Sequence, residues 1–233
     1  MSGLGWLVVL TLVISAATGL LIARGMRWWI ADADHADLLA ASRWYRPGVL
    51  TITGAVLGGG VAFLYPTSAG WGIDIVLLSL ILGASAAATP FLFIVDVLVH
   101  RLPDRLLYPL IGLELAVLIL GGQSGDRSIW VSALVAAIAA TAFFGLLYLA
   151  GRLVHARTLG LGDVKLAFVV GAATGVHSVW ALAGVFVVTM IIAGSVSLIA
   201  AARAGSLRGT VIAFGPAMLS GMWLGSVVHR FLL

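Results

Sequence analysis

Two aspartates beside apolar runs are the residues of this chain best suited to chemistry. Asp163 lies between a pair of glycines and a new apolar run, in the segment GLGDVKL of residues 160–166. Asp96 lies near the end of an earlier apolar run that ends at Val99. Two close carboxyl groups do not easily both ionise, so such a pair shares a proton. The ionised member can take a proton from water while the protonated member polarises a carbonyl oxygen, which permits amide hydrolysis without a metal or a covalent intermediate.

The glycines before Asp163 suit a site where the backbone must come close to other groups. Gly160 and Gly162 permit close approach and positive φ angles. Asp163 is also placed to cap the helix that follows, where the helix dipole favours its charged form. The simpler alternative is that Asp96 and Asp163 are only helix-end residues.

The composition identifies the kind of protein that must position these carboxylates. Of 233 residues, 62% are hydrophobic and only 9% are charged, whereas a soluble domain needs far more polar surface. Apolar runs of about 20 residues recur, as in transmembrane helices. The chain contains no cysteine, which excludes disulfides, thiolate zinc sites and cysteine nucleophiles. We therefore predict an all-α, polytopic helical bundle of one domain in the lipid bilayer.

About eight transmembrane helices are expected. Their approximate residue ranges are 4–23, 48–65, 73–99, 106–121, 129–150, 164–176, 179–202 and 209–231. The sixth is only about 13 residues long, so we expect it to be tilted or shielded by its neighbours. No basic residue precedes the first run, whereas Arg24 and Arg27 follow it, so we expect a retained span rather than a cleaved signal.

The basic residues indicate the orientation of these spans. On one side lie eleven: Arg24, Arg27, Arg43, Arg46, Arg101, Arg105, Arg152, Arg157, Lys165, Arg203 and Arg208. On the other side lie only Arg127 and Arg230. The positive-inside rule makes the first side cytoplasmic and places both termini outside. The cytoplasmic segments are then 24–47, 100–105, 151–163 and 203–208. The net charge of +4 is therefore a sign of topology rather than of nucleic-acid binding. Asp96 and Asp163 come to lie at similar depth, near the cytoplasmic face.

Other polar and aromatic residues have simpler interpretations. In the first cytoplasmic loop, the expected interfacial anchors are Trp28, Trp29, Trp44 and Tyr45. The polar residues interpreted as facing water, rather than as binding a metal, are Asp32, Asp34, His35 and Asp37. Glycine pairs with GxxxG spacing indicate close helix packing at Gly54/Gly58, Gly171/Gly175 and Gly221/Gly225. Glu114, deeper in a span, is expected to bond to a neighbouring helix or to belong to a polar site.

Asp104 has an expected structural role. It follows Leu102-Pro103 and precedes the apolar run from Leu106. Because Pro103 disfavours helix at Leu102, the preceding element should end there. We expect the Asp104 side chain to accept a hydrogen bond from a backbone N–H in the first turn of the next helix.

Three motifs in order resemble those of the type IV prepilin peptidase family. The segment of residues 160–166 resembles the family's GxGD motif. Asp96 with the downstream Pro103 and Asp104 resembles its first motif. Phe214-Gly215-Pro216 resembles a third element, the Pro-Phe-Gly-Pro of the last helix, with Ala213 in place of the first proline.

The resemblance implies a membrane aspartic endopeptidase of the GxGD type. Asp96 and Asp163 match the catalytic aspartates, and the matching supporting residues are Gly160, Gly162, Lys165, Pro103, Asp104, Phe214, Gly215 and Pro216. It implies no metal or other cofactor. The partners would be pilin-like precursors with an N-terminal leader and a hydrophobic helix, cut just before that helix at the cytoplasmic face of the bacterial inner (plasma) membrane. Such precursors serve type IV pilus assembly or protein secretion.

The resemblance also predicts a division of the chain. Residues 1–70 would hold the N-terminal helices and a short cytoplasmic loop, and residues 73–231 the peptidase core. Many bacterial members carry a cysteine-bearing cytoplasmic segment linked to N-methylation of the product. This chain has no cysteine and only a short loop there, so methyltransferase activity and S-adenosylmethionine binding are not expected.

Two rival hypotheses use the same features. The first is a proton- or ion-coupled transporter that uses the same carboxylates, with Pro90 and the short sixth span as broken-helix features. It does not explain the paired aspartate motifs. The second is a membrane assembly scaffold without enzymatic activity, against which the intact Asp96 and Asp163 argue.

Overall fold

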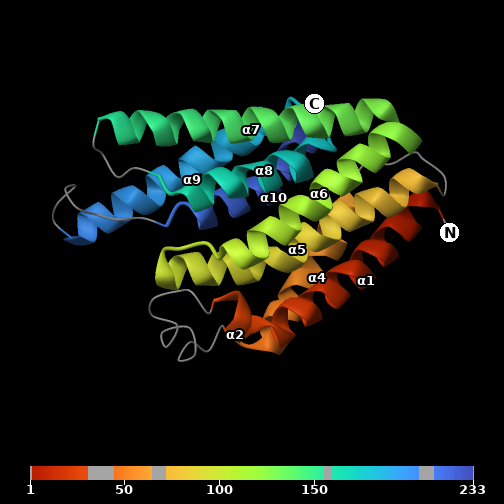
Figure 1. Cartoon of the computed structure of the whole chain (residues 1–233), viewed down its shortest axis with the longest axis horizontal. Coiled ribbons are helices and arrows are strands. Elements are labelled where there is room, and N and C mark those ends of the chain that lie inside the picture. The colour runs from red at the N-terminus through yellow and green to blue at the C-terminus, as the bar shows by residue number, and fades with distance from the viewer. Residues whose placement is uncertain (1, 31–44, 65–71, 155–158, 205–212, 233) are drawn as a thin grey trace.

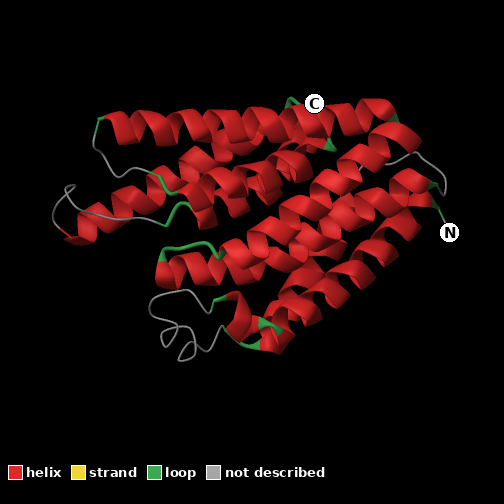
Figure 2. Cartoon of the chain, viewed as in Figure 1, coloured by secondary structure: helices red, strands yellow, loops and turns green. Residues whose placement is uncertain are grey.

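The computed structural model describes residues 2–30, 45–64, 72–154, 159–204 and 213–232. Within these ranges it contains nine helices and no strand (Figure 2), so the all-α prediction is confirmed. The helices are α1 (Gly3–Arg24), α2 (Met26–Trp29), α4 (Pro47–Leu64), α5 (Ile73–Val99), α6 (Asp104–Ser124), α7 (Arg127–Leu153), α8 (Leu161–Gly175), α9 (Ala181–Ala204) and α10 (Gly215–Leu232).

Each of the eight expected spans overlaps one helix of the described residues. In the part of the chain that the structure describes, six helices are long and apolar enough to cross a membrane, namely α1, α4, α5, α6, α7 and α9, which supports a polytopic membrane protein. Helix α8 has 15 residues and measures about 22 Å, less than the ~30 Å hydrocarbon core. The expectation of a short sixth span is therefore confirmed.

The start of the last helix differs from the sequence prediction. The predicted span began at residue 209, but α10 begins at Gly215, and Ala213 and Phe214 precede it in a non-helical conformation. Residues 209–212 lie outside the described ranges. Pro216 explains the boundary, because a proline lacks the N–H that a helix interior requires and is tolerated in the first turn. Hydropathy alone did not reveal this boundary, since the residues before Gly215 are also largely apolar.

Helix α5 is the centre of the bundle (Figure 1). It packs against α1 and α4 on one side and against α6, α8 and α10 on the other. The apolar window of α5 is 89% buried, whereas the windows of the other five candidate spans are only 22% to 39% buried. These five helices therefore turn most of their surface outward, as expected for lipid-facing helices, and α5 forms the core.

Close helix contacts occur at the glycine pairs. A Cβ atom at Gly171 of α8 would lie 2.6 Å from the carbonyl oxygen of Ala136 in α7. A Cβ at Gly54 of α4 would lie 2.9 Å from Cα of Ala87 in α5. Gly225 of α10 similarly faces the backbone of Val185 in α9. The packing interpretation of the GxxxG spacing is thus confirmed.

A hydrogen-bonded cluster joins the start of α5 to the turn between α6 and α7. The Asp74 carboxylate accepts hydrogen bonds from the Asp126 N–H at 3.0 Å and from Nε1 of Trp130 at 2.7 Å. Asp126 in turn caps α7 by accepting from the hydroxyl and N–H of Ser128, which lowers the pKa of Asp126. This cluster fixes the end of α5 opposite to Asp96.

Candidate active site

Asp96 and Asp163 line the same pocket, which has a volume of about 440 Å³. Asp96 belongs to the last turn of α5 and Asp163 to the first turn of α8. The turn between α5 and α6, with Pro103 and Asp104, forms another wall. The structure therefore brings together two carboxylates that are distant in the sequence.

Asp96 is held by the third sequence motif. Its side chain is buried, with only 4% exposed, and its Oδ2 accepts a hydrogen bond of 3.0 Å from the N–H of Gly215. Gly215 is the first residue of α10, so this N–H has no partner within its own helix. A Cβ atom at this position would lie 2.7 Å from Oδ2 of Asp96. A side chain at position 215 would therefore displace the Asp96 carboxylate or the start of α10.

Asp163 is held by the start of its own helix. It is the third residue of α8, and its Oδ2 accepts a hydrogen bond of 3.0 Å from the N–H of Gly160. The N–H of Asp163 donates in return to the carbonyl oxygen of Gly160 at 3.2 Å. This reciprocal pair confirms the predicted capping role. Both carboxylates therefore lie at helix N-termini, where the helix dipole favours negative charge.

Gly162 and His100 bring the turn after α5 against α8. A Cβ atom at Gly162 would lie 3.1 Å from Cβ of Leu102, so the start of α8 packs tightly on this turn. His100 ends α5 in the left-handed conformation, with φ 54° and ψ 36°. Among the described residues it is the single non-glycine with positive φ. Such backbone strain is frequent at functional sites, and His100 lines the pocket.

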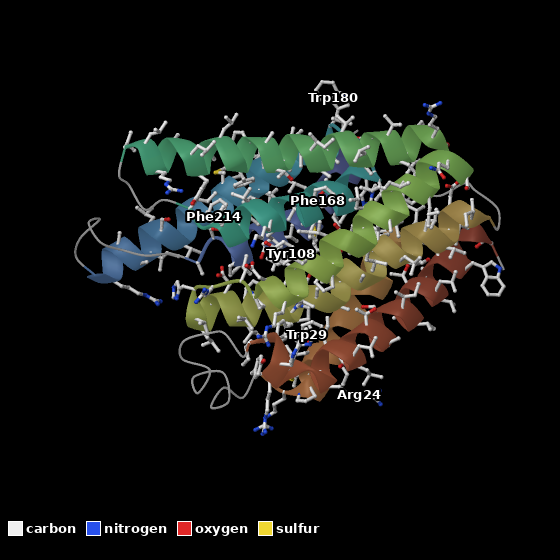
Figure 3. The ribbon with its side chains drawn as sticks, viewed as in Figure 1. Arg24, Trp29, Tyr108, Phe168, Trp180 and Phe214 are labelled. Atoms are coloured by element: carbon white, nitrogen blue, oxygen red, sulfur yellow. The ribbon has the colours of Figure 1, made fainter. Side chains whose placement is uncertain are left out.

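Asp104 does not have the predicted capping role. Pro103 occupies the N-cap position of α6, and no side chain caps this helix. The Asp104 carboxylate instead forms an ion pair of 2.6 Å with Nζ of Lys165. Lys165 also lies over the ring of Tyr108, 4.4 Å from its centroid. Tyr108 is labelled in Figure 3. Asp104 pairs with Lys165 rather than capping α6 because an ammonium group at this distance is a stronger partner than a backbone N–H.

Phe214 and Pro216 are the sequence neighbours of Gly215, whose N–H donates to Asp96. The ring of Phe214 lies 5.7 Å from that of Phe144 in α7, and Phe144 contacts Phe186 of α9. Pro216 lines a second pocket beside the first. All ten residues predicted for the site are therefore gathered at one end of the bundle.

Trp29 and Ile30 form one wall of the pocket. This wall was not predicted from the sequence. Trp29, labelled in Figure 3, is predicted to be an interfacial anchor. Its Nε1 also donates a hydrogen bond of 3.0 Å to the carbonyl of Ile22. Arg105 of α6 fastens the same segment by donating to the carbonyl of Trp28 at 3.1 Å. In the sequence, only the pair of tryptophans directly after Arg27 indicated this role. Trp44, Asp32, Asp34, His35 and Asp37 lie outside the described residues.

Glu114 lies outside the pocket and bonds to a neighbouring helix. It is fully buried, and its Oε1 accepts a hydrogen bond of 2.8 Å from the hydroxyl of Ser85 in α5. Its Oε2 has no hydrogen-bond partner. The predicted contact with a neighbouring helix is confirmed, and Glu114 links α5 to α6 away from the two aspartates.

The fold and the pocket define a polytopic helical membrane protein with two carboxylates gathered at one end of the bundle. Residues 85–202, just over half of the chain, match the type IV leader peptidase family. The chain belongs to this family, as the motif resemblance predicted. The matched region contains Asp96 and Asp163 and ends before Gly215. No curated protein and no solved structure matches the chain significantly.

Proposed function

We propose that this leader peptidase is an aspartic endopeptidase in which Asp96 and Asp163 form the catalytic pair. The observation that carries the proposal is that both carboxylates line one pocket, each bonded to a backbone N–H at the start of a helix. Membership of a peptidase family favours hydrolysis over the ion-coupled transporter.

The proposed reaction needs one ionised and one protonated carboxyl group. The ionised member accepts a proton from water, and the resulting hydroxide attacks the carbonyl carbon of the scissile amide. The protonated member donates its proton to the carbonyl oxygen. When the tetrahedral intermediate collapses, the proton taken from water passes to the leaving amine, and the other carboxylate takes back one proton from a hydroxyl group of the intermediate. The pair thus returns to its starting state with one proton between its members, without a metal or cofactor.

The proposed substrates are pilin-like precursors, cut between the leader and the hydrophobic helix, in pilus assembly or protein secretion. The family match supports this class of substrate. The positive-inside bias supports a multi-pass orientation in the bacterial inner membrane with the pocket at the cytoplasmic face. In this proposal residues 73–231 supply the peptidase core, and Trp29 and Ile30 of the N-terminal part complete the pocket wall.

The test is co-expression of the chain with a pilin-like precursor, followed by detection of the shortened product. Wild type should shorten the precursor, whereas Asp96→Asn and Asp163→Asn should leave it intact at equal membrane levels. Cleavage by either properly inserted variant at the wild-type rate would refute the pair. An ion flux in vesicles, without cleavage of any precursor, would support the transporter instead.

A further inference from the structure

A second pocket, of about 310 Å³, lies beside the proposed active site. We name it the lateral groove and define it by Phe93 and Val97 of α5, Ala193 and Val196 of α9, and Ala217 of α10. His100 lines both the groove and the carboxylate pocket. The groove therefore continues directly from the end of α5 where Asp96 lies.

The two pockets differ sharply in chemistry. The carboxylate pocket contains six charged residues, namely Asp96, Arg101, Asp104, Arg105, Asp163 and Lys165. Among the described residues that line the groove, none is an aspartate, glutamate, lysine or arginine. Phe93, Val97 and Val196 are 37%, 45% and 46% exposed, so the groove is open at its side. In a membrane-spanning bundle, such an opening faces lipid.

We propose that the lateral groove binds the apolar segment of the precursor as a helix, beginning just after the scissile bond. This inference rests on the proposed function. The precursor has the same division as the two pockets, because a polar leader is followed directly by an apolar helix. When the scissile bond lies at Asp96 and Asp163, the precursor segment that follows it passes His100 and enters the groove. Apolar helices commonly bind by laying one face into a hydrophobic groove.

Cross-linking tests the occupant of the groove, and the chain allows it without background because it contains no cysteine. Val196→Cys places a thiol in the groove, and Leu198→Cys is the matched control on the same helix, outside the groove and 68% exposed. The precursor carries one cysteine in the first two turns of its apolar segment. Because a disulfide requires Cα atoms within about 7 Å, mild oxidation should join Val196→Cys to the precursor and leave Leu198→Cys unjoined.

Filling the groove provides a kinetic test. Ala193 lines the groove, whereas its neighbour Gly194 has open space around it. Ala193→Trp should raise KM for the precursor about tenfold and change kcat less than about twofold, because it removes binding and leaves the chemistry intact. Gly194→Trp, the matched control, should behave like wild type. If Ala193→Trp fails to insert, Val196→Trp replaces it.

The outcomes separate this inference from the proposed function. If wild type cuts the precursor but the Val196→Cys and Leu198→Cys variants cross-link to it equally, the groove assignment alone is overturned. A normal KM in both groove-filling variants would also overturn it. So would labelling of Val196→Cys by a lipid-linked maleimide with no cross-link to the precursor, because the occupant would then be lipid. Wild type that cuts no precursor would instead refute the proposed function and this inference with it.

Discussion

Gly215 and Asp96 meet through one hydrogen bond of 3.0 Å, from the glycine N–H to the carboxylate Oδ2. The donor is the first N–H of α10, and the acceptor lies in the last turn of α5. The start of one helix thus fixes a carboxylate of another. Asp163 is fixed similarly by Gly160, within the start of α8. The two proposed catalytic groups are therefore positioned by main-chain atoms rather than by side chains.

Gly215→Ala should abolish most of the activity. The added Cβ would lie 2.7 Å from Oδ2 of Asp96, so the carboxylate must move. A displacement of about 1 Å at a catalytic group can cost about 10²-fold in rate. Cleavage of a precursor by purified enzyme measures the loss. Gly60→Ala is the control, because a Cβ at Gly60 meets nothing within 4 Å. Equal activity of both variants would show that the contact with Asp96 is dispensable.

Asp104→Asn should keep most activity, whereas Asp96→Asn should lose it. An asparagine at 104 still accepts a hydrogen bond from Lys165. The lost ion pair lies at an exposed position and is worth roughly 0–1 kcal/mol. At position 96, by contrast, asparagine can neither give up nor take the shared proton. Cleavage is compared at matched membrane levels. An inactive Asp104→Asn beside an active Asp96→Asn would mean that the catalytic aspartate of this segment is Asp104.

The segments that precede and follow α8 should open to opposite sides of the membrane. Leu161 is the first residue of α8 and Trp180 follows its end, and both side chains are exposed. A membrane-impermeant maleimide added to intact cells should label Trp180→Cys and spare Leu161→Cys, which should react only after the membrane is opened. Labelling of Leu161→Cys in intact cells would place the pocket on the outer side and refute the predicted topology.

Gly171→Ala should destabilise the bundle without direct damage to the pocket. The new methyl group would lie 2.6 Å from the backbone of α7, and overpacking of this kind costs about 1–3 kcal/mol. Thermal unfolding in detergent should show a lower midpoint than for wild type. Gly194→Ala, with open space around residue 194, should show no decrease. An unchanged midpoint for Gly171→Ala would mean that α7 and α8 can separate without loss.

The product should not be methylated. The chain contains no cysteine, and the loop that we predict to be its first cytoplasmic one is short. Mass spectrometry of a mature pilin made with this chain as the sole peptidase measures the new N-terminus. An added mass of one methylene group there would contradict the expectation.

The sequence predicted those features that depend on local patterns. Long apolar runs located the helices, and motif spacing selected Asp96 and Asp163, because each pattern lies within a short stretch of chain. The contact between Gly215 and Asp96 joins residues distant in the sequence, so spacing could not predict it. The same limit explains the error at Asp104: local capping logic took no account of Lys165, which only the fold brings within 2.6 Å. The place of Trp29 in the pocket wall was not predicted, because tryptophans at a membrane interface and tryptophans that line a pocket have the same sequence context.

Because α8 is short, the thickness of the surrounding bilayer should affect the rate of the proposed reaction. A helix of about 22 Å cannot reach both surfaces of a ~30 Å core, so the bilayer must thin around it or leave one end recessed. Asp163 lies at one of these ends, and hydrolysis there consumes water. Shorter acyl chains bring the headgroup region, with its water, closer to the aspartate. Turnover should therefore rise as the surrounding acyl chains shorten, which couples this peptidase to the growth temperature and lipid supply of its cell.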